Sequence, residues 1–308
     1  MSTAIQAKKN AMKELFTPKQ IAKAIQVSES SIKRWCDQGL IAASYTAGGH
    51  RRVRVSSFLE FVKTHGYQIL HPEELGLPVA IGQSKRALEL SVQPFLDALL
   101  CGDEMAARQI AVDLFLAENS IARICDEVIA KTFCEIGKLW QCGAAEIYQE
   151  RRACEICQRV IYELRGLIPQ APPESPIAIG GTAEGDPYSL ASMTVELVLR
   201  DHRWNANSLG YNLPFETLHA AIKDHRPKLF WLSVSHLPDQ ERFVSGYRRL
   251  YEEFQGDTFF VLGGRAMNEE LRRQIKYSVF CDTLQHLEGF IESLSGKGNA
   301  RREVKSEA

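Results

Sequence analysis

The 308-residue sequence has no long hydrophobic run. No segment approaches the ~20 apolar residues that a membrane-spanning helix needs. Its first residues, Met1 to Ala4, lack the basic, apolar and small-residue order of a secretion signal. Eight cysteines are spread over the chain, which favours reduced thiols over a disulfide scaffold. These absences predict a cytoplasmic protein without a membrane partner.

The net charge is only −1, but it is distributed unevenly. Residues 1–66 carry eleven Lys/Arg and four Asp/Glu, a balance of +7, and the rest of the chain has a balance of −8. A basic module joined to an acidic body favours binding of a polyanion by the module. The length predicts two or three domains with ample core.

Residues 17–36 have the pattern of two short helices joined by a tight turn. Thr17 before Pro18 is a helix start, and Ser28 is a second N-cap ahead of a helix over 29–36. In a helix-turn-helix, the second helix enters the major groove of DNA and its early residues meet the base edges. The candidates for DNA contact in this segment are Thr17, Ser30, Ser31, Lys33 and Arg34.

The adjacent Gly48 and Gly49 predict the tip of a β-hairpin with a basic flank. Arginines on this flank would lie on phosphates or enter the minor groove. Ser56 is expected to cap a third helix over 57–64. The candidates for DNA contact in the hairpin are His50, Arg51, Arg52 and Arg54.

Residues 15–66 resemble the winged helix-turn-helix domain of MerR-type and excisionase-like regulators. The residues that carry the likeness are Phe16, Thr17, Pro18, Val27, Ser28, Ile32, Arg34, Trp35, Gly39, Leu40, Ile41 and the run from Gly48 to Arg52. The resemblance implies a domain over 1–66 that binds double-stranded DNA at a promoter or operator in the bacterial cytoplasm or nucleoid. It also implies a dimer or tetramer, with RNA polymerase as a further partner. The alternative is an unrelated helical domain with a solvated basic surface.

A linker is expected over 67–84, followed by a four-helix bundle over 85–168. The helices are expected at 85–100, 103–117, 119–140 and 145–166, with short connections between antiparallel neighbours. Trp140, followed after nine residues by Glu150 and Arg151, resembles the segment that caps the upper face of adenosylcobalamin in light-sensing cobalamin-dependent MerR-type repressors. Those repressors have His where this chain has Arg151. The alternatives are that Trp140 is buried in the core and that Arg151 pairs with Glu155.

Residues 175–295 alternate apolar strands with helical segments. The strands are expected at 177–181, 206–209, 229–234, 259–262 and 278–281, and the alternation predicts a doubly wound parallel sheet. Ligands of such sheets bind at the carboxyl ends of the strands, here the loops 182–191, 235–238 and 263–265. Residues 296–308 are small and charged and are expected to be a disordered tail.

A spaced frame runs through these loops. It starts at Asp186, Tyr188 and Ala191. After forty-one intervening residues come Ser233 and Ser235, and after a further twenty-seven come Gly263 and Gly264. The spacing resembles the cobalamin-binding family, whose frame is Asp-x-His-x-x-Gly, Ser-x-Leu and Gly-Gly. The resemblance implies a flavodoxin-like sheet and a ligand pocket over this frame. Tyr188 stands where the family has its cobalt-ligating His, and Ala191 stands for the last Gly.

These replacements bear on the ligand. A phenol with a pKa near ~10 is a poor ligand for cobalt, although it can ligate ferric haem. Arg151 could pair with the propionates of a haem or bilin. The expected cofactor is therefore a tetrapyrrole, and bilin or haem is favoured over cobalamin. The alternative is a relic sensor domain that binds no ligand. No metal site formed by protein ligands is expected. The expected ligand contacts are Trp140, Glu150, Arg151, Asp186, Tyr188, Ser233, Ser235, Gly263 and Gly264.

Together, these features predict a transcription regulator that senses a tetrapyrrole or light, and not an enzyme. Two alternatives stay open. One is a ligand-independent regulator or partner-recruiting protein with a relic sensor domain. The other is a corrinoid-carrying subunit of a methyltransferase, in which the basic module over 1–66 would have no function.

Overall fold

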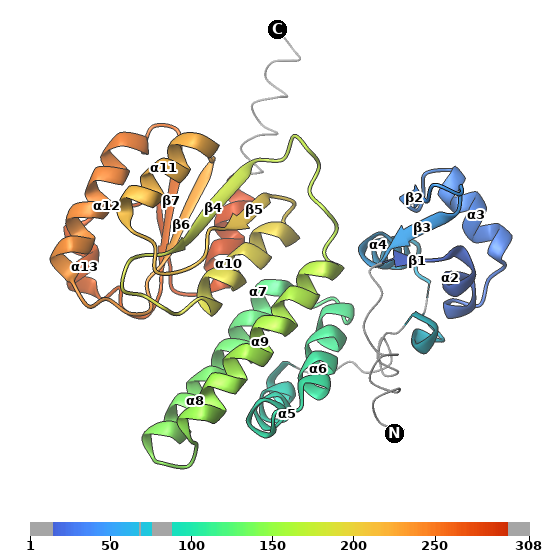
Figure 1. The fold of residues 1–308 in the computed structure, drawn as a ribbon, viewed down its shortest axis with the longest axis horizontal. Coiled ribbons are helices and arrows are strands. Elements are labelled where there is room, and N and C mark those ends of the chain that lie inside the picture. Colours follow the sequence, from blue (N-terminus) through green and yellow to red (C-terminus); the bar gives the residue numbers. More distant parts are fainter. Residues whose placement is uncertain (1–14, 68, 76–87, 295–308) are drawn as a thin grey trace, which may run out of the picture. The chain divides into compact units, whose positions relative to one another are not determined.

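The computed structural model describes residues 15–67, 69–75 and 88–294 (Figure 1). Contacts within the chain divide it into two compact units. The first runs to residue 119 and includes 139–170; the second comprises 120–138 and the chain from 171 onward. The predicted tail over 296–308 lies outside the described residues.

The first two helices of the N-terminal domain begin at the predicted caps. Helix α2 (Pro18–Ala24) has Thr17 as its N-cap, and the Thr17 hydroxyl accepts the Gln20 N–H at 3.2 Å while the Gln20 side chain accepts the Thr17 N–H at 3.0 Å. Helix α3 (Glu29–Asp37) has Ser28 as its N-cap, which accepts the Ser31 N–H. Ile32 is fully buried, so one side of α3 belongs to the core and the other is left for a partner.

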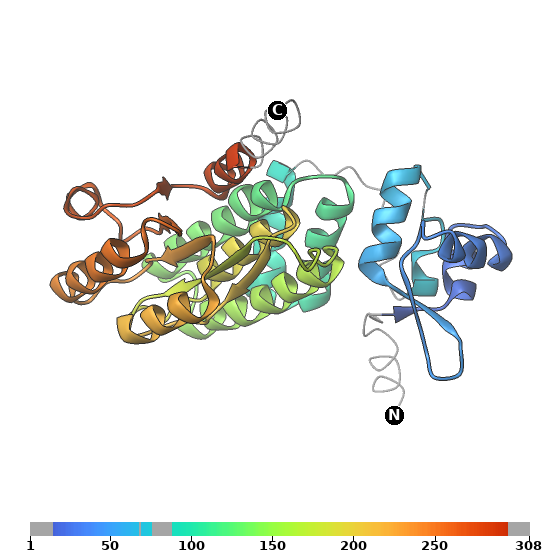
Figure 2. The ribbon, with the colours of Figure 1, turned by 90° about the horizontal axis from the view of Figure 1, so that it is seen from above.

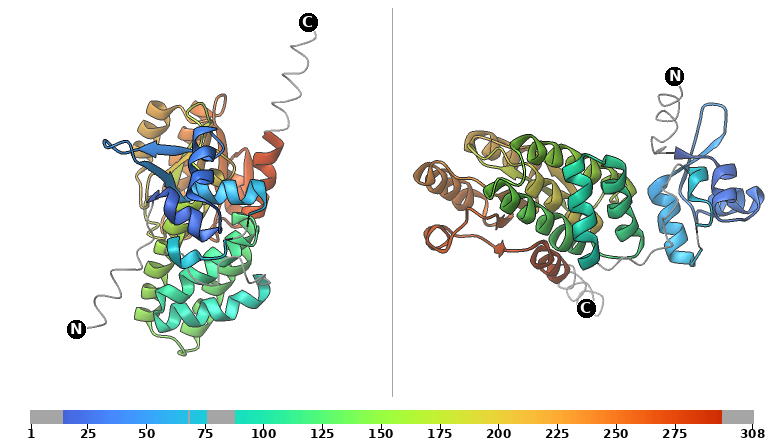
Figure 3. Two further views of the ribbon diagram at one scale, coloured as in Figure 1. Left: turned by 90° about the vertical axis from the view of Figure 1, so that its right-hand side faces the viewer. Right: turned by 90° about the horizontal axis from the view of Figure 1, so that it is seen from below.

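A three-stranded antiparallel sheet completes this domain. Its strands are β1 (Leu15–Phe16), β2 (Ala43–Tyr45) and β3 (Arg51–Arg54), in the order β1-β3-β2. The hairpin of β2 and β3 reaches out from the helices of its domain (Figures 2 and 3). The winged helix-turn-helix predicted from the sequence is therefore present.

Two details of this domain differ from the sequence predictions. Helix α4 (Val55–His65) begins directly after Arg54, so Ser56 is a buried residue within the helix and not its cap. Part of the predicted linker is ordered against α2: a short helix η1 (Pro72–Leu75) follows Leu70 and His71, whose N–H groups donate to the Ala24 carbonyl at 2.8 and 3.0 Å. These bonds satisfy an otherwise free carbonyl at the C-terminus of α2.

In the first unit, helices α5 (Leu88–Cys101), α6 (Glu104–Leu116) and α9 (Ile147–Leu167) pack against one another as a bundle. The Arg152 guanidinium donates to the Leu100 carbonyl near the end of α5 and lies 5.7 Å from the centre of the Tyr148 ring. Arg108, which is buried, forms an ion pair with Glu163 between α6 and α9.

The third predicted helix of the bundle is present without a break over 121–141, but it is not α-helical throughout. It consists of α7 (Ile121–Ile124), a π-helical turn η2 (Cys125–Ala130) and α8 (Lys131–Gln141). Residues 120–138 belong to the second unit, where the Asp126 carboxylate accepts the N–H groups of Leu284 and Gln285 at 2.9 Å each. Hydrophobic periodicity predicts a helix here but cannot show which partner its apolar side meets.

The second unit contains a parallel sheet of β4 (Ile177–Thr182), β5 (Asn205–Ser208), β6 (Leu229–Ser233), β7 (Phe259–Gly263) and β8 (Val279–Cys281). The strand order is β5-β4-β6-β7-β8, so the order reverses between β4 and β6. The connecting helices are α10 (Leu190–Asp201), α11 (Phe215–His225), α12 (Gln240–Phe254) and α13 (Glu269–Gln274), with a further helical segment at 284–294. The predicted flavodoxin-like class is confirmed.

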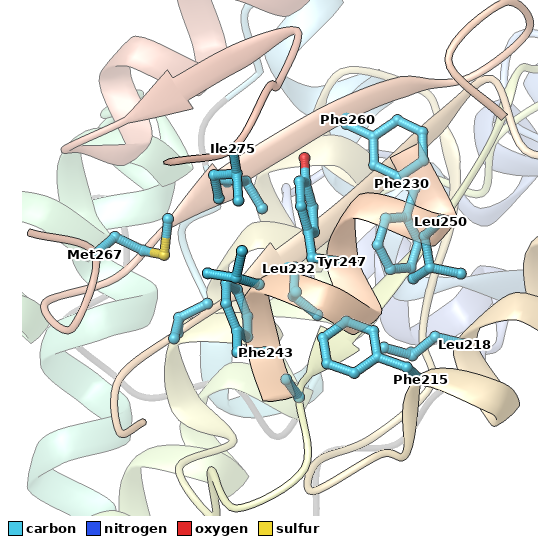
Figure 4. Close-up of a cluster of buried hydrophobic side chains, with 14 of the residues drawn as sticks. Phe215, Leu218, Phe230, Leu232, Phe243, Tyr247, Leu250, Phe260, Met267 and Ile275 are labelled. Atoms are coloured by element: carbon cyan, nitrogen blue, oxygen red, sulfur yellow. The ribbon is translucent and has the colours of Figure 1, made fainter. Parts of the chain in front are cut away.

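Alternate residues of the central strands face opposite sides of the sheet. Phe230, Leu232 and Phe260 pack with side chains of α11 and α12 in one apolar cluster (Figure 4). Trp231 faces the other side, where its indole N–H donates to the Ser192 hydroxyl of α10 at 2.9 Å. Burying each large side chain contributes about 1.5–3 kcal/mol, so this core holds the strand ends in place for the loops that follow them.

Candidate functional site

Three of the predicted DNA contacts lie on the outer side of α3. Ser30, Lys33 and Arg34 are exposed, but the Lys33 ammonium is 2.8 Å from the Glu29 carboxylate. Ser31 and Thr17 are engaged locally, since both take part in the hydrogen bonds of the helix caps. Arg34 is therefore the candidate in α3 whose charge is most available to a phosphate or base.

The hairpin arginines are not equivalent. Arg51 donates to the Asp37 carboxylate at 2.6 Å and lies 5.5 Å from the centre of the Tyr45 ring, and its side chain is 25% exposed. Arg52 donates to the Arg51 carbonyl, whereas His50 and Arg54 are exposed. Arg51 thus joins the hairpin to the last residue of α3.

The sequence analysis did not identify Asp37 and Tyr45 as partners of Arg51, because nothing local in the sequence links them.

In the second unit, the Asp186 carboxylate joins two of the predicted ligand loops. Asp186 is fully buried; one oxygen accepts the Tyr188 N–H at 3.1 Å and the other accepts the Ser235 N–H at 2.6 Å. Its backbone carbonyl accepts the Thr182 hydroxyl at 2.7 Å. Both carboxylate oxygens are thus committed to the backbone, and Asp186 sets the relative position of the loops after β4 and β6.

Tyr188 lies beside two side chains that the sequence analysis missed. The centre of its half-buried ring is 6.5 Å from the centre of the His236 ring and 5.4 Å from the Arg265 guanidinium carbon. His236 and Arg265 are both exposed, and Arg265 also donates to the Ser235 carbonyl at 3.2 Å. The signal for both was their place in the loops 235–238 and 263–265, which the sequence analysis already assigned to the ligand edge.

The glycine pair of the frame has a structural explanation. Gly264 has φ +111°, and a Cβ there would lie 2.3 Å from the Val234 carbonyl oxygen; at Gly263 it would lie 2.8 Å from the Cys281 carbonyl oxygen. Ser233, at the end of β6, is buried. These residues bring the backbones of neighbouring strands and loops close together, with or without a ligand.

Trp140, Glu150 and Arg151 belong to the first unit. Trp140 is 51% exposed, so the alternative that it is buried in the core is wrong. Arg151 is exposed and 3.9 Å from Glu150, whereas Glu155 lies 3.7 Å from Arg159; the suggested pairing of Arg151 with Glu155 is therefore not observed.

Of the two cysteines of α9, Cys154 is half-buried and Cys157 is buried. Burial raises the pKa of Cys154 to about 11 and also raises the pKa of Cys157. The described residues contain no group of three or more His, Cys, Asp or Glu arranged to hold a metal ion. None of the helices in the described ranges has the length and apolarity to cross a bilayer.

Two segments of the chain match known protein families, one in the N-terminal domain and one in the helical bundle. A helix-turn-helix domain family matches residues 15–66, and a B12 binding domain family matches residues 92–165. The B12 binding domain match includes Trp140, Glu150 and Arg151. The MerR-type assignment and light sensing are not tested by these matches and stay predictions.

One solved structure shares the fold of about two thirds of this chain. The monomethylamine corrinoid protein of Methanosarcina barkeri has a TM-score of 0.57 and 15% identity, over 68% of this chain and 100% of its own. A cobalamin-binding protein from Desulfitobacterium hafniense DCB-2 has a TM-score of 0.35 and 20% identity, over 64% of this chain and 93% of its own. No curated protein matches the chain in sequence. At 15% identity, the first likeness is one of fold.

Proposed function

We propose that the chain is a DNA-binding transcription regulator whose DNA affinity is set by a corrinoid bound in its C-terminal half. The observation that supports this most is the presence of a helix-turn-helix domain and a B12 binding domain in one chain. The sequence analysis put bilin or haem ahead of cobalamin. The comparisons give bilin and haem no support, so the proposal takes a corrinoid as the ligand.

The DNA-binding part of the proposal depends on the exposed surface of α3 and the hairpin. Arg34 would meet DNA in the major groove, with Ser30 beside it, and His50, Arg52 and Arg54 would contact the backbone or the minor groove. Arg51 would act differently, because its bond to Asp37 positions the hairpin. A regulator of this kind works on the chromosome, so the proposal places the chain in the cytoplasm.

The proposal puts the corrinoid ring at the carboxyl edge of the sheet, with one change from the family pattern. Tyr188 offers a phenol, but the exposed imidazole of His236 lies beside it, and imidazole nitrogen is a ligand suited to transition metals. A bound corrinoid would supply a cobalt centre at this edge. Asp186, Tyr188, Ser235 and Gly264 are the proposed contacts at this edge, whereas a ligand role for Trp140, Glu150 and Arg151 stays a prediction from the sequence.

A buried side chain fills the space between β4 and α10. In the family, the nucleotide tail of cobalamin passes beside the positions of Tyr188 and Ala191. Here the buried Trp231 indole lies between β4 and α10: a Cβ at Gly180 would be 2.2 Å from it, and its N–H donates to Ser192. We therefore propose that the ring binds at the edge while the tail stays outside the core.

A ligand changes DNA binding only if it binds two states of the protein with different affinity. We propose that these two states differ in their number of subunits: one is a dimer or tetramer bound to repeated DNA half-sites, and the other has fewer subunits. The assembly would set how RNA polymerase meets the promoter. The oligomer and the polymerase contact belong to the proposal and follow from the predicted regulator class.

The test uses the full-length protein. Hydroxocobalamin, haemin and biliverdin are titrated separately while absorption spectra are recorded. DNA selected from a random library is then bound at several salt concentrations, with and without the ligand, in the dark and in light. The expected results are a shifted corrinoid spectrum and a DNA affinity that changes when the corrinoid binds.

Three other results would contradict parts of the proposal. Binding of haemin or biliverdin alone would replace the corrinoid. DNA binding that no ligand or illumination alters would favour a relic sensor domain. Corrinoid binding without any DNA binding would favour the corrinoid-carrier alternative.

A further inference from the structure

Three side chains from three different loops meet at the carboxyl edge of the sheet. Tyr188 follows β4, His236 follows β6 and Arg265 follows β7. The Tyr188 ring contacts the His236 ring edge to face, at an interplanar angle of 76°. The Arg265 guanidinium lies over the Tyr188 ring. Because β4 and β6 are adjacent, this cluster lies where the strand order reverses, the usual ligand position of such sheets.

One buried carboxylate sets the positions of the first two loops. Asp186 accepts the N–H of Tyr188 and, at 2.6 Å, the N–H of Ser235, which directly precedes His236. The Arg265 guanidinium donates to the Ser235 carbonyl, which belongs to the next peptide unit, the one that joins Ser235 to His236. The backbone before His236 is therefore constrained at both its N–H and its carbonyl.

The imidazole itself is available to a ligand. His236 is exposed, and no hydrogen bond of its ring nitrogens is formed within the described part of the chain. A neutral imidazole nitrogen is a common metal ligand at physiological pH, whereas a phenol with a pKa near ~10 stays protonated there. Of the two rings at this edge, His236 has the better donor for cobalt.

We propose that His236 is the protein's axial ligand for a corrinoid cobalt, supplied by the loop after β6 in place of the residue at position 188. Tyr188 packs against the imidazole, and Asp186 is a positioning residue for the loop. The inference rests on the proposed function, since it needs a corrinoid at this edge. It adds the atom that binds the metal and the reason that the chain tolerates Tyr188.

The experiment is electron paramagnetic resonance of Co(II) cobinamide bound to the full-length protein. Cobinamide lacks the nucleotide base, so a nitrogen axial ligand can come only from the protein or an added buffer, and a buffer without nitrogen is used. One axial ¹⁴N splits each cobalt line into three. Protein labelled with ¹⁵N-histidine should show two lines instead, which identifies the nitrogen as that of a histidine.

His236→Ala should abolish the splitting. The matched control is His225→Ala, because His225 is an exposed histidine of the same unit that precedes β6 at the opposite edge of the sheet. His225→Ala and Tyr188→Phe should both keep the splitting. Circular dichroism checks that each variant is folded.

Different results would contradict the role of His236 and the proposed corrinoid function. If the wild-type protein binds cobinamide but shows no nitrogen splitting, or if the splitting survives in His236→Ala, the inference is wrong and the proposed corrinoid function stands. If the protein binds neither cobinamide nor hydroxocobalamin, both are wrong.

Discussion

The role assigned to Asp186 leads to a quantitative prediction for Asp186→Ala. The substitution removes a buried carboxylate that accepts two backbone N–H groups, from Tyr188 and Ser235. Hydrogen bonds to a charged group contribute ~1.5–3 kcal/mol each, and water reaches the half-buried Tyr188 loop and offsets part of the loss. We therefore expect a loss of about 3 kcal/mol in the second unit. A domain of this size shifts its melting temperature by roughly 2–4 °C per kcal/mol, which gives roughly 6–12 °C.

The assay combines calorimetry of the full-length protein with hydrogen exchange of peptides covering 183–190 and 233–237. In Asp186→Ala both peptides should exchange faster, because their amides lose the same acceptor. Asp186→Asn keeps one acceptor oxygen and should lie between the wild type and the alanine variant. Asp257→Ala is the control, because Asp257 is exposed in the turn before β7 and its replacement should change stability by less than ~0.5 kcal/mol.

Two results would refute this reasoning. One is a melting temperature of Asp186→Ala within error of Asp257→Ala, which would mean that the carboxylate does not hold the loops. The other is faster exchange in only one of the two peptides, which would mean that Asp186 does not couple them.

Three further predictions follow from the structure. Gly264→Ala should impair folding, because a Cβ would meet the Val234 carbonyl at a positive φ, whereas Gly256→Ala, with open space around it, should be tolerated in thermal melts. The pKa of Cys154 is raised to about 11, so the neutral thiol contributes fully to stability below about pH 9, and this contribution disappears as the pH rises to about 11. The melting temperature of the wild type, measured relative to that of Cys154→Ser, should therefore fall between these pH values. Labelling of Cys154 by iodoacetamide at pH 8 should be on the order of 100-fold slower than labelling of an ordinary thiol. Arg34→Ala should remove about one phosphate contact, which lowers the slope of log binding constant against log salt concentration by ~0.9. Arg51→Ala should weaken DNA binding with a smaller change in this slope, because Arg51 is already paired with Asp37. Equal slope changes for the two variants in gel-shift titrations would contradict this distinction.

Several features were predictable from the sequence because their causes are local. Thr17 and Ser28 cap helices through hydrogen bonds that span three residues, so a short window of sequence contains the whole interaction. Alternating strand and helix segments predicted the doubly wound parallel sheet for a similar reason. Ser56 shows the limit of this approach: a residue suited to capping lies within α4, because the strand β3 continues directly into the helix.

The partners of the functional side chains were not predictable in the same way. Arg51 looked like a free phosphate contact until the structure placed Asp37 beside it. The helix expected over 119–140 was predicted as one element, but it contains a π-helical turn and its first part belongs to the second unit. In each case the deciding contact comes from a distant part of the chain.

By itself, the sequence determined which kinds of domain the chain has, since caps, periodicity and motif spacing are properties of neighbouring residues. Only the tertiary structure decided what surrounds Tyr188. His236 and Arg265 come from separate strands, and parallel pairing in register brings the ends of those strands together. The physical reason is that a ligand edge forms from side chains that share a place in space, and sheet register sets that place.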